Sequence, residues 1–167
     1  MNDNYSKGVL RLLTLAKEEA IRLGHTYVGS EHVLLAIIKD KDGNAALTLT
    51  TIGCNLNKML NFIETSINST NATTTLGHLP LTRRAERILK NSNYEAEKKG
   101  RKIATQNDIL LSLCKEKDGL SKDVLNSFSI EYDIVLSYLN SNFDIKTVKN
   151  IKVTSNSTPT LDMFSRN

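Results

Sequence analysis

Apolar residues recur every three or four positions along most of the chain, which is the spacing of a helix that buries one face. The first run lies between Ser6 and Gly24, and its apolar face consists of Val9, Leu12, Leu13, Ala16 and Ala20. Similar runs predict helices over 31–39, 44–51, 56–67 and 83–99. No segment sustains the alternation of apolar and polar residues that a half-buried strand requires. The pattern therefore predicts an all-α fold.

Small polar residues and glycines mark where these helices begin and end. The predicted N-caps, whose side-chain oxygens accept a backbone N–H of the first turn, are Ser6, Ser30, Asn55 and Thr82. Gly24 and Gly100 each follow a long helical run, at the place where helices commonly end in a left-handed residue. The chain is thus divided into helices joined by short connections.

The second half of the chain repeats the pattern of the first half at a constant shift of 76, which is the separation of Gly24 from Gly100. At this shift the matches include Arg11 with Arg87, Leu34 with Leu110, Gly43 with Gly119 and Leu60 with Leu136. An ordered series of matches through four successive helices indicates a tandem duplication of a four-helix unit. We expect the two units to pack as a pseudo-two-fold eight-helix bundle around one core.

The duplication predicts where the domain is divided. Repeat one covers about residues 5–67 and repeat two about residues 79–141, so that the domain spans 1–142. Between them, residues 68–78 are rich in Asn and Thr and are predicted to be a linker. Residues 143–167 lack a sustained apolar face and are predicted to be a flexible tail.

Composition excludes some classes of function. The net charge of the 167-residue chain is +4, but acidic residues are interleaved with the basic ones, which disfavours a nucleic-acid surface. No apolar run approaches the length of a membrane span, and the first residues do not resemble a signal peptide. We therefore expect a cytoplasmic protein that binds neither nucleic acid nor membrane.

Residues that often catalyse reactions or bind metals are few, and their spacing suits neither task. His25, His32 and His78 lack the spacing of metal ligands. Cys54 and Cys114 lie in apolar helical runs, so we expect them to be buried, reduced thiols rather than nucleophiles. The chain also lacks a Gly-x-x-x-x-Gly-Lys-Ser/Thr phosphate loop. We therefore expect no metal, no cofactor and no enzyme activity in these residues.

Three segments resemble a known family. The segment Leu15–Leu35 closely resembles the first Clp repeat of the Clp ATPases, especially the ClpC type, and Leu79–Ala85 resembles the entry to the second repeat. The segment Thr158–Arg166 resembles the passage from the N-domain to the first AAA+ module. The resemblance implies an N-terminal domain of a larger ATPase. The alternatives are a stand-alone Clp-repeat adaptor and the N-domain of a disaggregase.

The resemblance also implies a role and a set of partners. In the family, the parent ATPase forms a hexamer that uses ATP and Mg²⁺ to unfold proteins and threads them into the ClpP peptidase. The N-domain receives protein substrates and adaptor proteins, so we expect a recognition domain that is a monomer when isolated. Apolar side chains of these partners could dock in a groove between the repeats, which the sequence does not resolve into residues.

Some relatives of the ClpC type bind phosphorylated arginine, and the resemblance carries over to particular residues. Each repeat of those relatives supplies a hydroxyl residue at the start of its first helix and a Glu at the start of its second. Ser6 and Glu31 match this pair in repeat one. A helix N-terminus offers N–H groups to a phosphate, and a carboxylate accepts two hydrogen bonds from a guanidinium. The alternative is that both residues only cap their helices.

Repeat two departs from that pattern. Thr82 supplies the hydroxyl, but Asn107 stands where Glu31 stands in repeat one, and a neutral amide cannot pair with a guanidinium charge. Asp108 occupies the position of His32, and it could instead cap the helix by reaching back to Thr105. The sequence therefore predicts at most one working pocket, in repeat one.

Overall fold

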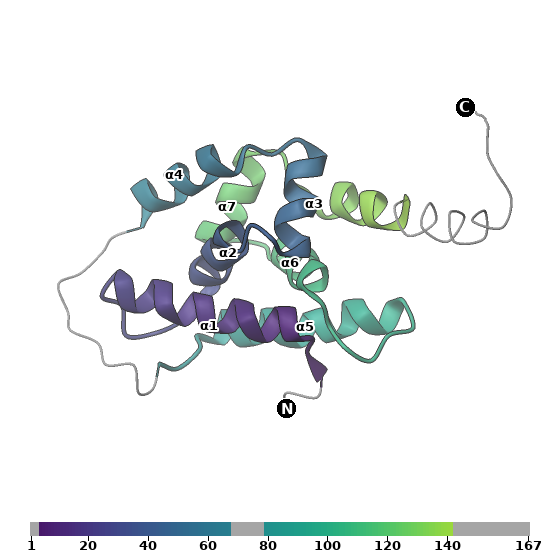
Figure 1. Cartoon of the computed structure of the whole chain (residues 1–167), viewed down its shortest axis with the longest axis horizontal. Helices are drawn as coiled ribbons and strands as arrows, with labels where there is room; N and C mark the ends of the chain where they lie inside the picture. Colours follow the sequence, from purple (N-terminus) through teal and green to yellow (C-terminus); the bar gives the residue numbers. More distant parts are fainter. Residues whose placement is uncertain (1–3, 68–78, 142–167) are drawn as a thin grey trace, which may run out of the picture. The chain divides into compact units, whose positions relative to one another are not determined.

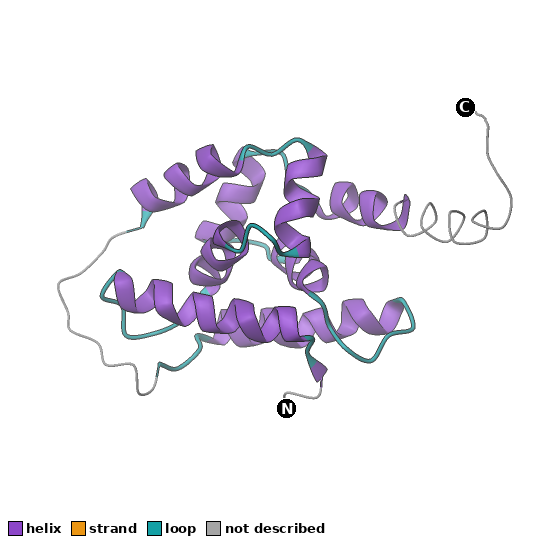
Figure 2. Ribbon diagram, viewed as in Figure 1, coloured by secondary structure: helices purple, strands orange, loops and turns teal. Residues whose placement is uncertain are grey.

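The fold is all-helical. The computed structural model describes residues 4–67 and 79–141, so the predicted linker 68–78 and tail 143–167 lie outside the described residues. The helices are α1 (Lys7–Arg22), α2 (Ser30–Lys39), α3 (Asn44–Ile52), α4 (Leu56–Ser66), α5 (Arg83–Lys98), α6 (Gln106–Lys115) and α7 (Leu120–Ser127). An eighth helix begins at residue 132 and continues to 141, the last described residue. Figure 2 shows the helices and the loops that join them.

The described residues up to Val135 form one compact unit, and those from Leu136 onward belong to a second. At the centre of the first unit lie α2 and α6, each with eight of its ten residues buried (Figure 1). Their apolar runs, Val33–Ile38 and Ile109–Leu113, supply many of the largest fully buried side chains. A helix that is apolar on nearly every side must be surrounded by other helices. This explains why α2 and α6 correspond to the most continuously apolar runs of the sequence.

Each repeat begins with an antiparallel helical hairpin. α1 ends beside Gly24, which has φ +76°, and α5 ends beside Gly100, which also has φ +76°. A left-handed backbone strains a residue that carries a Cβ, so glycine is favoured at both turns. The chain then reverses: the N–H groups of His25 and Arg101 reach back to the carbonyls of Ala20 and Ala96. The predicted ends of these two helices are confirmed.

Short backbone ladders join the two repeats, and each ladder is the pseudo-two-fold copy of the other. Ser6 N–H donates to the carbonyl of Ala104 at 2.9 Å, and Ala104 N–H donates to the carbonyl of Asn4 at 2.9 Å. The other ladder follows the same pattern: Thr82 N–H donates to Val28 at 2.9 Å, and Val28 N–H donates to Pro80 at 2.8 Å. The shift of 76 relates these partners. These two isolated bridges are the only strand-like pairings among the described residues.

The predicted caps are confirmed at three positions and wrong at one. The side chains of Ser6, Asn55 and Thr82 accept N–H groups of Val9, Lys58 and Ala85. The cap of α2, however, is Gly29, and Ser30 is the first helical residue. Ser30 lies one position inside the helix because His32 supplies the capping group instead: its Nδ1 accepts the N–H of Gly29 at 2.9 Å. The Ser30 hydroxyl is thereby left to bond with Ser121 at 3.0 Å.

Candidate functional site

The structure does not bring Ser6 and Glu31 into one pocket. α1 and α2 are antiparallel, and an ion pair of 2.9 Å between Arg11 and Asp40 fixes the start of α1 beside the end of α2. Glu31 therefore lies toward the far end of the hairpin, about 24 Å of helix away from Ser6. The prediction of a pocket within repeat one is wrong in this respect, because helices joined by a short turn place their N-termini at opposite ends.

The structure instead places Glu31 close to Thr82, which belongs to the other repeat. The backbone of Thr82 is bonded to Val28, three residues before Glu31, so the N-termini of α2 and α5 meet at this point. We use the name Glu31 site for Glu31, Thr82 and Tyr27. The equivalent meeting of N-termini, related by the shift of 76, brings Ser6 close to Asn107 and Ile103. Each candidate site is thus shared between the two repeats.

The Glu31 carboxylate lies against Gly29. A Cβ at position 29 would be only 2.6 Å from Oε1 of Glu31, so the close approach depends on glycine at this position. Glu31 is half-buried and makes no hydrogen bond or ion pair within the described part of the chain. Tyr27 is 37% exposed, and burial, together with the charge of Glu31, raises the pKa of its hydroxyl. The Glu31 site thus presents an unpaired carboxylate beside an accessible aromatic ring.

The equivalent positions of the other site are already engaged. The amide oxygen of Asn107 accepts the Thr48 hydroxyl at 2.7 Å, which ties it to α3. The shift of 76 places Val124 where Thr48 stands, so α7 offers no such partner to Glu31. This difference explains why the amide oxygen of Asn107 is engaged while the carboxylate of Glu31 has no partner among residues 4–67 and 79–141.

Asp108 is buried and has a structural role rather than a role in binding a ligand. It is fully buried, accepts the Thr105 N–H at 2.8 Å and forms two hydrogen bonds with Arg101. Burial opposes its ionisation, but the bonds from Arg101 and Thr105 outweigh burial and hold the pKa of Asp108 below its ordinary value. The interpretation of Asp108 as a cap for α6 is confirmed.

A pair of histidines replaces this ion pair in repeat one. Because His32 Nδ1 accepts the Gly29 N–H, the proton of neutral His32 is on Nε2, which donates to Nδ1 of His25 at 2.7 Å. Tyr27 stacks on His25 at 3° and 5.3 Å, so the pair supports the aromatic wall of the Glu31 site. Burial, and then the neighbouring His25, lower the pKa of His32 to about 4, against the opposing effect of Glu19.

Other polar clusters are duplicated and therefore belong to the architecture. Glu19 bonds with Arg22 at 2.8 Å and Lys39 at 2.9 Å, and the equivalent Glu95 bonds with Lys98 at 3.3 Å and Lys115 at 3.2 Å. In both clusters burial disfavours the carboxylate charge, yet the bonds from Arg22 and Lys39 lower the pKa of Glu19, and those from the Tyr132 hydroxyl, Lys115 and Lys98 lower the pKa of Glu95. The features that the duplication did not copy are the better candidates for function.

Cys54 and Cys114 are both free and buried, as predicted. Burial raises the pKa of the Cys54 thiol, and it raises that of Cys114 to about 12 although the Lys122 charge opposes it. Within the described ranges, no three His, Cys, Asp or Glu side chains are grouped so that they could hold a metal ion. In the same ranges no helix is long and apolar enough to cross a bilayer.

Sequence reasoning did not identify Tyr27 as part of the site. The sequence did contain a signal for it: an aromatic residue just before a helix start, outside an apolar run, is a candidate for the surface rather than for the core. Sequence reasoning also missed that the Glu31 partner would be Thr82, since only the ladders between the repeats bring these residues together.

The fold defines a helical domain built from two fused repeats. The model of the Clp repeat (R) N-terminal domain matches residues 4–155, so the chain belongs to this family. The chain is 32% identical over 171 residues to "Negative regulator of genetic competence ClpC/MecB" of Bacillus subtilis, and 31% identical over 172 residues to "Chaperone protein ClpB" of Oceanobacillus iheyensis. Each alignment covers 99% of this chain and 21% of the relative, so the chain spans about a fifth of their length.

Solved structures share the fold at lower sequence identity. The N-terminal domain of ClpD from Arabidopsis thaliana has a TM-score of 0.65 and 17% identity, with 83% of this chain and 96% of that chain covered. A complex of the ClpV N-domain with a VipB peptide has a TM-score of 0.57 and 14% identity, with 75% and 79% covered. These likenesses confirm the eight-helix architecture expected from the duplication.

Proposed function

We propose that this domain recognises protein substrates and adaptor proteins for a AAA+ ATPase of the ClpC type. The larger protein would bind ATP and Mg²⁺ through other residues and deliver substrates to the ClpP peptidase in the cytoplasm. The similarity to ClpC over nearly the whole chain supports this proposal. The ClpV N-domain, which shares the fold, forms a complex with a peptide, which supports recognition of protein segments.

The Glu31 site suits phosphorylated arginine. Its unpaired carboxylate can accept two hydrogen bonds from a guanidinium. The neighbouring start of α5 can accept a phosphate, because the first N–H groups of a helix have no partner within the helix. Thr82 bonds the N–H of Ala85, which leaves the preceding N–H groups of α5 for the ligand. The observation that carries this proposal is a carboxylate that is unpaired among the described residues and lies beside a helix N-terminus, since the duplication has Asn107 in place of this carboxylate.

Calorimetry with a phosphoarginine peptide tests the proposal. Glu31→Gln removes the charge that pairs with the guanidinium, so we expect affinity to fall about tenfold or more. Thr82→Ala disturbs the start of α5 and should reduce affinity less. Gly29→Ala should also weaken binding, because its Cβ displaces the Glu31 carboxylate while the φ of −108° suits alanine.

The matched controls are Asn107→Ala and Ser6→Ala, which alter the equivalent site. We expect one ligand per chain and little change in affinity with either control. Binding that survives in Glu31→Gln but disappears in Asn107→Ala would contradict the assignment.

A second candidate is the N-domain of a ClpB chaperone, which the 31% identity over nearly the whole chain favours. A ClpC-type parent protein should bind ClpP, whereas a disaggregase should not. Co-sedimentation of the full-length protein with ClpP in the presence of ATP separates the two. Absence of ClpP binding would favour the chaperone.

A further inference from the structure

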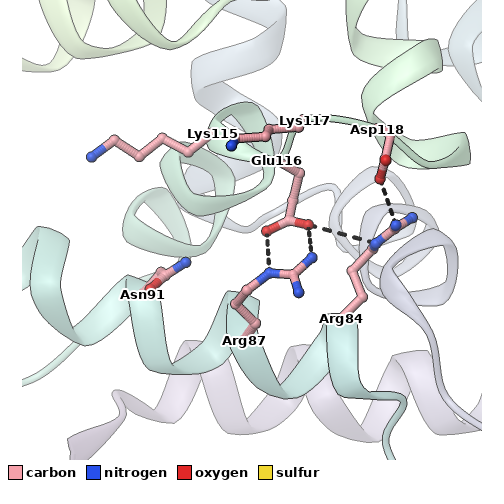
Figure 3. A pocket seen from close by; sticks show the side chains of 7 residues that line it. All are labelled: Arg84, Arg87, Asn91, Lys115, Glu116, Lys117 and Asp118. Atoms are coloured by element: carbon pink, nitrogen blue, oxygen red, sulfur yellow. Dashed lines mark hydrogen bonds and ion pairs between the residues drawn. The ribbon is translucent and has the colours of Figure 1, made fainter.

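A charged hollow of about 540 Å³ lies between α5 and the connection from α6 to α7. The lining residues are Arg84, Arg87, Asn91, Lys115, Glu116, Lys117 and Asp118, shown in Figure 3. The four basic side chains outnumber the two acidic ones. This volume is many times the roughly 30 Å³ that one water molecule occupies in the liquid. The hollow therefore has room for more than one side chain of a ligand.

A buried carboxylate fixes the arginines of this hollow. The Glu116 side chain is only 5% exposed and accepts hydrogen bonds from both Nε and Nη2 of Arg87 (Figure 3). Arg84 lies 3.6 Å from Glu116 through Nε and also bonds with Asp118. Two carboxylates therefore neutralise two guanidinium groups and hold them in place. The remaining N–H groups of Arg87, including both on Nη1, have no acceptor within the described residues.

Two lysines leave the hollow with an excess of positive charge. Lys117 has no ion pair in the part of the chain that the structure describes. Lys115 shares the single carboxylate of Glu95 with Lys98, so two ammonium groups face one negative charge. The Asn91 side chain likewise has no hydrogen-bond partner within the described ranges. Donors from two elements thus surround the hollow, and within the described residues Lys117 and the Asn91 side chain have no acceptor there.

The duplication copied most of the residue types that line this hollow, with Lys39, Lys41 and Asp42 standing where Lys115, Lys117 and Asp118 stand, but it did not copy Arg84 and Asn91. Arg87 and Glu116 correspond to Arg11 and Asp40, which also form an ion pair, so this pair is architectural. Arg84, however, corresponds to Gly8, and Asn91 corresponds to Leu15. In repeat one the side chain of Gln106 bonds with the Gly8 carbonyl at 3.0 Å and with Asp40 at 2.9 Å, and thus occupies this space.

We propose that this hollow binds the carboxylate side chains of an acidic peptide segment in a partner protein. The fixed guanidinium of Arg87 supplies directional N–H donors, and Lys117 supplies a charge that has no ion pair among the described residues. The spread of the donors over two elements and several residues suits a peptide with successive acidic residues better than a single small anion. This site differs from the Glu31 site and does not depend on phosphoarginine recognition.

NMR titration of the ¹⁵N-labelled chain with tetraglutamate peptide tests the proposal, with tetraglutamine as the neutral match. We expect tetraglutamate, but not tetraglutamine, to shift the amide resonances of Asn91 and of residues 115–118. Its affinity should fall about fivefold or more when salt rises from about 50 to about 300 mM. Equal shifts from both peptides, or none at the hollow, would overturn the proposal.

Charge reversal supplies the matched control. Lys117→Glu should lower the affinity for tetraglutamate about fivefold or more, whereas Lys41→Glu, the equivalent change in repeat one, should not. Equal losses of affinity in the two variants would show only attraction by the net charge and would overturn the proposal.

Inorganic phosphate is the third probe. Binding of phosphate at the hollow without binding of tetraglutamate would also overturn the proposal of a peptide site. Lys117 and Lys41 are both exposed and neither has an ion pair within the described residues, so both variants should keep the wild-type melting temperature.

Discussion

At the scale of residues, the two repeats use different side-chain pairs at equivalent positions: a pair of histidines in repeat one and an ion pair in repeat two. His25 and His32 occupy the positions that Arg101 and Asp108 hold in repeat two. Both pairs connect the hairpin turn to the third residue of the following helix, and both third residues accept the N–H of the cap. The ion pair keeps its charges at neutral pH, whereas the histidine pair requires a neutral His32.

This difference predicts how stability depends on pH. The pKa of His32 is lowered from its ordinary 6.5 to about 4, so the folded state binds fewer protons than the unfolded state between these values. The contribution of His32 is therefore fully present above pH 6.5 and is lost as the pH falls toward 4. A shift of this size corresponds to about 3 kcal/mol at most. Urea unfolding at a series of pH values measures it.

A double variant tests whether the histidines cause the loss. His25→Arg with His32→Asp transplants the pair of repeat two, whose aspartate has a pKa below its ordinary 3.8. We expect its free energy of unfolding to fall less than that of the wild type between pH 6.5 and 4. Parallel pH profiles for the two proteins would contradict the role assigned to His32.

At the scale of elements, side chains at the starts of α2 and α6 join the repeats. Gln106 donates to the Gly8 carbonyl and to Asp40, and its oxygen accepts the Ala45 N–H at 3.3 Å. The equivalent residue, Ser30, makes one bond of 3.0 Å with Ser121. One amide thus links α6 to three elements of repeat one, whereas one hydroxyl links α2 to α7.

Removal of these links should have unequal effects on stability. Gln106→Ala leaves polar groups of several elements without their partner, and we expect the free energy of unfolding to fall by about 2–3 kcal/mol. Ser30→Ala loses one hydrogen bond and should cost about 1 kcal/mol. Thermal and urea unfolding measure both changes. A larger loss for Ser30→Ala would contradict the dominant role of Gln106.

The duplication predicted the elements but could not predict these links. The 3.6-residue periodicity and the two glycines with left-handed φ lie within short stretches of sequence, so they locate the helices directly. The cap of α2 was mispredicted by one residue because Ser30 and Gly29 both suit a cap, and the bond between His32 and Gly29 decides between them. Such a choice depends on a contact rather than on propensity.

At the scale of the whole molecule, the two repeats share one core. The ladders between them are reciprocal, and α3 packs on α6 while α2 packs on α7. Each repeat therefore buries its apolar surface partly against the other. We expect neither half to fold alone when the chain is expressed as two pieces divided within 68–78.

Circular dichroism and thermal unfolding of the two pieces test this expectation. Each piece alone should lack a cooperative transition, and an equimolar mixture should recover helical signal and unfold cooperatively. A cooperative transition in either isolated piece would show that the repeats are independent domains.

The sequence by itself determined the helical elements, the duplication and the residue types at each helix start. These properties depend on local periodicity and on a constant shift, both of which are present in the order of residues. Only the tertiary structure decided which starts meet. Because each hairpin is antiparallel and the ladders cross between repeats, Glu31 lies close to Thr82 and not to Ser6. Likewise, Glu31 has no partner among the described residues, whereas Asn107 bonds with Thr48 of α3, a contact across the fold that no local pattern reveals.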